Sequence, residues 1–181
     1  MLVRTVGLRI SLLSSLCLCV GSALATDAAS TSSSASYGTP PDPKAFITLA
    51  SQDNMTEVQL GELAMRNTRN PNVHRFAQRM INDHGKANTE LVGIAQQRNL
   101  IVAKELDPEH TALVQDLSSK NGPEFDAAYA KTMEDAHAKA ISLFKRATKT
   151  SDPELSQFAR QTLPTLEEHK RMADKLNSNN K

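Results

Sequence analysis

The stretch from Pro71 to Ile94 constrains the fold more than any other part of the chain. Apolar or small residues recur there with spacings of four and three, at Val73, Ala77, Met80, Ala87, Leu91 and Ile94. This spacing predicts a helix that packs its apolar seam in a bundle. His84 occupies a seam position where Leu or Ala is expected. A histidine ring in an apolar seam either forms hydrogen bonds within the core or belongs to a binding site. Polar residues on the other segments help to distinguish these alternatives.

Helical periodicity also runs through residues 44–67, 123–149 and 153–176. The turns at Asn70-Pro71 and Asp152-Pro153 each offer a capping side chain followed by proline, and they join the segments into two antiparallel hairpins, 44–67 with 71–98 and 123–149 with 153–176. The connection over 99–122 is long enough to cross the bundle and contains one short predicted helix. The sequence therefore predicts an all-α, ferritin-like antiparallel four-helix bundle of two αα-hairpins with a long crossover containing a short helix.

The N-terminus has the form of an export signal. Arg4 and Arg9 precede a short apolar run that ends in Ala23-Leu24-Ala25. This pattern predicts a signal peptide over 1–25, cleaved after Ala25. The run is shorter than the ~20 apolar residues that span a bilayer. We expect a periplasmic or secreted protein without a membrane span after cleavage, with a disordered Ser/Ala/Pro-rich tether over 26–42, the bundle over 43–177 and a polar tail over 178–181.

Charge and cysteine content exclude several classes of function. Loss of Arg4 and Arg9 with the signal turns the formal net charge of +1 into −1, which gives no electrostatic basis for nucleic-acid binding. Cys17 and Cys19 both lie within the signal, so the mature chain has no disulfide and no thiol chemistry. The sequence contains no Gly-rich phosphate loop and no Ser-His-Asp arrangement. Enzymatic activity is therefore less expected than binding.

Each long helix places one strong metal-ligand type on its seam: Glu57, His84, His137 and His169. At ~1.5 Å per residue, Glu57 and His84 lie ~17 and ~20 Å from the turn between their helices, and His137 and His169 lie ~20 and ~24 Å from theirs. All four side chains are therefore expected near the middle of the bundle. Three imidazoles and one carboxylate suit Fe, Mn, Zn or Cu ions.

Other polar residues are assigned supporting or surface positions. Glu134 completes a Glu-x-x-His pair with His137, and Asp53 lies one turn before Glu57, so both are expected beside the ligands. Asp83 points to a different face from His84 and is expected at the surface or in contact with a ligand. His74 and His110 are expected in solvent. The alternative to a metal is a polar core in which Glu57 and the histidines bind one another by hydrogen bonds alone.

Two motifs give the sequence a family resemblance. Phe76-Ala77 followed by Met80 and Asp83-His84 forms the first. The second runs from Phe158-Ala159 through Leu163-Pro164 and Leu166 to His169, and the stretches Met55–Gly61 and Phe125–His137 fit as well. At these residues the chain resembles the exported bacterial family filed as domain of unknown function 4142. The resemblance covers about residues 44–176 and implies a ferritin-like bundle and an envelope location, but no defined activity.

The sequence departs from the di-iron ferritin pattern. That pattern has Glu three residues before the histidine on the second and fourth helices, where this chain has Ile81 and Leu166. A mononuclear site is therefore favoured over a di-metal redox centre. The hypotheses that remain are an exported metal-binding bundle, with a role in metal handling or envelope stress, and a metal-free structural or interaction module.

Overall fold

We describe a computed structural model, which defines residues 38–102 and 104–179. In this part of the chain all regular structure is helical: α1 (Pro43–Asn67), α2 (Pro71–Gln97), α3 (Pro108–Ser118), α4 (Gly122–Ala147) and α5 (Pro153–Asn179). The predicted signal peptide and most of the predicted tether lie outside the described residues. The last helix continues to Asn179, into the segment expected as a polar tail, because Asn177 donates a hydrogen bond to the Glu134 carboxylate on α4.

Capping explains where the helices begin. Asp42, Asn70 and Asp107 each accept a hydrogen bond from a backbone N–H of the first turn, at 3.1, 2.9 and 2.9 Å. Proline follows each of them at the first helical position, where its missing N–H leaves no hydrogen bond unmade. Asp152 caps α5 in the same way, accepting from the Leu155 N–H at 3.1 Å. The capping residues that predict the helix starts therefore make the expected hydrogen bonds in the structure.

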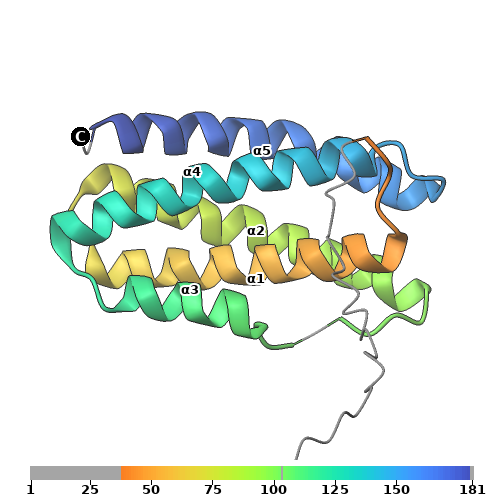
Figure 1. Ribbon diagram of the computed structural model, residues 1–181, viewed down its shortest axis with the longest axis horizontal. Coiled ribbons are helices and arrows are strands. Elements are labelled where there is room, and N and C mark those ends of the chain that lie inside the picture. The colour runs from red at the N-terminus through yellow and green to blue at the C-terminus, as the bar shows by residue number, and fades with distance from the viewer. Residues whose placement is uncertain (1–37, 103, 180–181) are drawn as a thin grey trace, which may run out of the picture. The chain divides into compact units, whose positions relative to one another are not determined.

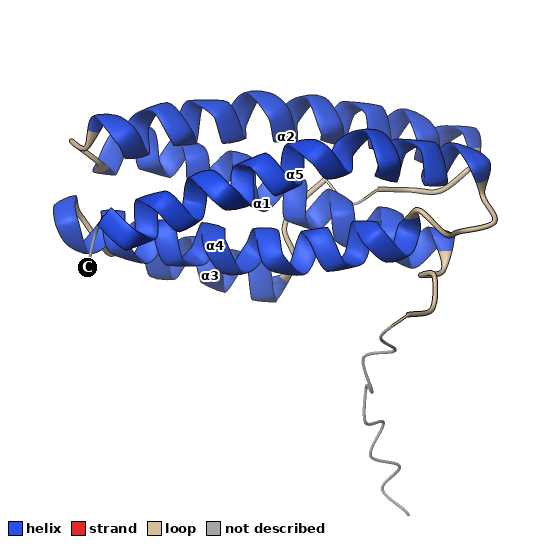
Figure 2. Ribbon diagram, turned by 90° about the horizontal axis from the view of Figure 1, so that it is seen from above, coloured by secondary structure: helices blue, strands red, loops and turns tan. Residues whose placement is uncertain are grey.

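The helices form an antiparallel bundle of two hairpins. α1 packs against α2 and α4 packs against α5, while α1 also packs on α4 and α2 on α5 (Figures 1 and 2). The crossover carries α3 along the outside of the bundle, against α1 and α4 (Figure 1). The predicted all-α, ferritin-like bundle with a helix in its crossover is confirmed.

Two apolar clusters fill the bundle, one on each side of its middle. One is built around Phe46, Phe144 and Phe158, whose rings meet edge to face or tilted. The other is built around Phe76 and Tyr129. On each long helix the residues of one cluster come before, and those of the other after, the position of Glu57, His84, His137 or His169. The polar residues therefore form a layer between two apolar halves.

Near that layer, α1 and α2 approach closely at Gly61. A Cβ atom on Gly61 would lie 2.8 Å from Ile81 Cγ1 and 3.1 Å from the backbone oxygen of Ala77. Neither distance leaves room for a methyl group without movement of α2. The close approach fixes α1, and with it Glu57, against the helix that carries His84.

Two sets of polar contacts hold the part of the crossover that precedes α3. The Arg98 guanidinium at the end of α2 donates to both oxygens of Asp152, at 2.8 and 2.5 Å, and to Glu154 at 2.9 Å. Such a bidentate pair fixes orientation as well as distance, so it joins the two hairpins at one end. Before α3, the Gln52 side chain on α1 accepts from the Asp107 N–H at 3.0 Å and donates to the Glu105 oxygen at 3.1 Å.

Candidate functional site

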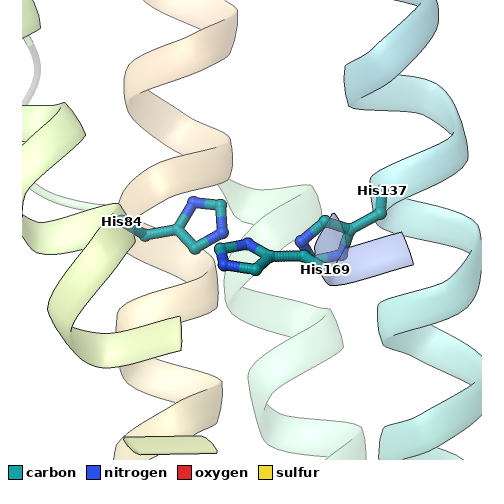
Figure 3. A group of neighbouring side chains, drawn as sticks. All are labelled: His84, His137 and His169. Atoms are coloured by element: carbon teal, nitrogen blue, oxygen red, sulfur yellow. The ribbon is translucent and has the colours of Figure 1, made fainter. Parts of the chain in front are cut away.

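The structure brings Glu57, His84, His137 and His169 together in the buried middle of the bundle. The ring centres of His84, His137 and His169 are 5.3–5.5 Å apart, and one nitrogen from each lies within 4.8 Å of the others (Figure 3). Glu57 Oε2 lies 2.7 Å from His84 Nε2 and 3.3 Å from His137 Nε2. No more than 5 % of any of these three side chains is exposed.

Each histidine uses its outer nitrogen to bind a different part of the bundle. His137 Nδ1 donates to the backbone oxygen of Met133 at 2.8 Å, and since a carbonyl oxygen only accepts, this nitrogen carries the proton. His84 Nδ1 donates to Asn54 Oδ1 at 2.9 Å. His169 Nε2 donates to Asp83 Oδ2 at 2.9 Å. These contacts fix the orientation of all three rings.

The inner atoms face one another, and while all three rings are neutral none of these atoms is a donor. His84 Nε2, His137 Nε2, His169 Nδ1 and Glu57 Oε2 are buried and have no aligned hydrogen-bond partner within the described part of the chain. With the outer nitrogens protonated, each inner nitrogen of a neutral ring presents a lone pair. Four acceptors thus lie close together, and a bound proton, a metal ion or a buried water molecule can satisfy them.

Burial and close packing shift the pKa values of these side chains. Burial opposes ionisation of Glu57, but attraction to His137 and His84 outweighs it and lowers the pKa of Glu57 to about 2. Burial also opposes a charge on His84, yet the Glu57 carboxylate outweighs it and raises the pKa of His84. Burial, reinforced by repulsion from His84, lowers the pKa of His169 to about 4 despite the contact with Asp83. In the absence of a metal, the proton of the group is therefore held between Glu57 and His84.

The Asp83 contact is itself fixed from outside. Arg79 donates to Asp83 Oδ2 at 3.2 Å and makes a bidentate pair with Glu168 on α5, at 2.9 and 2.8 Å. Arg79 therefore joins α2 to α5 and orients the carboxylate that binds His169. Asp83 lies at the surface, with 36 % of its side chain exposed, and also contacts His169, one of the predicted ligands.

Other predicted residues lie elsewhere. Glu134 does not point toward the histidines, because its carboxylate accepts from Asn177 on α5. Asp53 is partly exposed and faces His110 Nε2 at 3.4 Å; burial and repulsion from Glu57 raise the pKa of Asp53 to about 6. The expectation of a solvated His110 is wrong, since only 18 % of its side chain is exposed and its Nδ1 lies 2.8 Å from Asp107 Oδ1. His74 is exposed, as expected.

Asn54 is the functional candidate that the sequence does not reveal. It lies beside the seam position given to Asp53, yet it is 95 % buried and binds His84. The available signal is its spacing: Asn54 lies three residues before Glu57, so both side chains share a face of α1.

The sequence matches a known protein family. Residues 28–176 match the family model described as Domain of unknown function (DUF4142). The chain belongs to this family. No curated protein matches the sequence significantly. Within the described residues, no helix is both long and apolar enough to cross a membrane.

Solved structures share the fold at low sequence identity. A DUF305 fragment from Deinococcus radiodurans is 15 % identical, with a TM-score of 0.68 over 78 % of this chain and 99 % of the other. A presumed secreted DUF305 protein from Streptomyces coelicolor is also 15 % identical, with a TM-score of 0.66 over 76 % of this chain and 92 % of the other. CopM in its Cu(II)-bound form is 16 % identical, with a TM-score of 0.66 over 78 % and 99 %. At these identities the likeness establishes the bundle and nothing finer.

Proposed function

We propose that this protein is exported and binds one transition-metal ion through Glu57, His84, His137 and His169. The proposal is carried by four buried acceptor atoms that lie close together, while the N–H group of each histidine ring points outward. A ring nitrogen that binds a metal must offer its lone pair, and the outer hydrogen bond of each ring selects the form that does so. Three nitrogens and one oxygen form a complete four-coordinate donor set.

The donor set favours holding a metal over catalysis with it. Catalytic zinc sites keep a coordination position open for water or substrate, whereas four protein ligands close a tetrahedral shell. The proposed ligand set contains one carboxylate, Glu57, whereas ferritin-type di-iron centres use several carboxylates. We therefore propose a role in metal handling or envelope stress, and not in redox catalysis. His-rich shells suit zinc or copper, and copper is the first ion to test because one protein of this fold has been seen with Cu(II).

The decisive test uses the parent protein purified from the compartment to which it is exported. We expect about one transition-metal ion per chain, and a fall in melting temperature when a chelator removes it. Ligand at ~100 times its dissociation constant stabilises a fold by about 2.7 kcal/mol, which amounts to several degrees for a domain of this size.

Variants show whether the ion lies in the bundle core. His84→Ala, His137→Ala and His169→Ala should each abolish most of the chelator effect, while His74→Ala, which changes an exposed histidine on α2, should retain it. If the parent contains no stoichiometric metal and melts alike with and without chelator, the metal function is wrong. The group is then a proton-sharing polar core, and the protein a structural or interaction module.

A further inference from the structure

A cavity of about 320 Å³ lies on the α1, α3 and α4 side of the bundle. Glu57 forms part of its wall, although the Glu57 side chain is only 3 % exposed. The same residue presents Oε2 to His84 and His137. Glu57 therefore lies between the cavity and the histidines, and it contacts two of them.

Carboxylates outnumber cationic groups in the cavity wall. Asp53, Glu57, Glu109 and Asp135 line it, together with His110, Lys139 and uncharged residues. Low-dielectric walls that carry one sign of charge concentrate the field and raise the local concentration of ions of opposite sign. Asp53 lies one helical turn from Glu57 on α1, so carboxylates are placed in succession from the outer wall toward the core.

The opposite side of the group is less open to a cation. There, between α2 and α5, the carboxylate of Asp83 binds His169. The Arg79 guanidinium covers it and binds both Asp83 and Glu168. Arg79 therefore pairs with the carboxylates on this side, which leaves them less available to an approaching metal ion.

We propose that the acidic cavity is the route by which a metal cation enters and leaves the histidine group, with Asp53 and Glu109 attracting the ion and Glu57 passing it inward. The inference rests on the proposed metal function and adds the path and the residues that set the loading rate. α3 forms the outer wall, and its attachment to α1 through Gln52 and His110 keeps the cavity in place.

The test measures loading of the metal-free protein with Cu²⁺ at low ionic strength, followed by quenching of tyrosine emission in a stopped-flow instrument. Asp53→Asn combined with Glu109→Gln should slow loading about tenfold, within the 10–10³ range of electrostatic steering, and the difference should shrink at high salt. Glu90→Gln, which removes an exposed carboxylate on α2, serves as the matched control and should load like the parent.

A second variant tests the path independently of charge. Ala136→Phe fills part of the cavity and should slow both loading and chelator-driven release by the same factor, so that the equilibrium dissociation constant is unchanged. Ala138→Phe places the same ring on the exposed side of α4 and should change neither rate.

The outcomes separate the route from the metal function. A parent that takes up none of Cu²⁺, Zn²⁺, Mn²⁺ and Fe²⁺ overturns the metal function and the route with it. A parent that binds Cu²⁺ while every variant loads at the parental rate overturns the route alone. A weaker affinity at an unchanged loading rate would make Asp53 or Glu109 a ligand and also overturns the route.

Discussion

Acid should destabilise the metal-free protein through His169, and the size of the effect can be worked out. The His169 ring is fully buried, and its pKa falls from 6.5 to about 4 on folding. Between these two values the unfolded chain binds a proton at this residue that the folded chain does not. Because stability rises with pH wherever the unfolded state binds more protons, the contribution of His169 to the free energy of unfolding must fall as the pH falls from 6.5 to 4.

Each pKa unit is worth about 1.4 kcal/mol, so the His169 contribution amounts to about 3 kcal/mol across this window. That is a large part of the 5–15 kcal/mol typical of a single domain. His84 adds no slope here, because its raised pKa makes its contribution fully present below pH 6.5. The lowered pKa of Glu57 removes stability only below about 4.5. Asp53, with a pKa raised to about 6, acts in the opposite direction between 6 and 3.8.

The assay is urea unfolding in the presence of a chelator at several pH values from 7.5 to 4, for the parent and for His169→Gln. The glutamine amide can still donate to Asp83 but has no proton to gain in this range, so the parent should lose about 3 kcal/mol more than the variant between pH 6.5 and 4. His74→Gln is the control and should follow the parent. Parallel loss of stability in the parent and in His169→Gln would refute the assignment of the acid effect to His169.

Three shorter predictions test other contacts. Asn54→Ala, which leaves His84 Nδ1 without its acceptor, should weaken metal affinity ~10-fold or more in a competition titration. Gly61→Ala should lower the free energy of urea unfolding by about 1–3 kcal/mol, because overpacking against α2 outweighs the ~1 kcal/mol gain in helix propensity, whereas Gly85→Ala and Gly93→Ala, with nothing within 4 Å, should raise it. Metal binding at pH 6.5 should release ~0.5–1 proton from His84, measured by calorimetry in two buffers of different ionisation enthalpy.

The fold could be predicted because several local signals agree. The seam spacing around Val73 to Ile94 sets one buried face, and the Asn70-Pro71 and Asp152-Pro153 turns set where two helices begin. Since each long helix then has one face for the core, a strong polar residue on that face had to lie in the core. The seam positions of Glu57 and the three histidines therefore predict that the four side chains lie in one layer.

The supporting residues could not be predicted in the same way. Seam spacing gives the face of a helix but not the rotation of a ring, so it did not show which nitrogen of each histidine turns inward. Asn54 and Asp53 are adjacent, and a helical rotation of one position decides which is buried; the packing of α1 at Gly61 buries Asn54. Glu134 follows the Glu-x-x-His spacing, yet Asn177 on another helix binds its carboxylate. Such tertiary contacts are absent from a pattern read along one helix.

The outward direction of the three ring protons links the acid prediction to the metal proposal. A polar core that only had to satisfy itself could direct one ring N–H at Glu57 and so leave fewer acceptors without a donor. Here each of the three rings directs its N–H outward, to Met133, Asn54 or Asp83. The centre therefore has no donor unless a further proton is bound. That proton is held by His84 beside Glu57, and it occupies the place where a metal would bind. Protons and metal therefore compete for one point, and acid should release the ion before it unfolds the bundle.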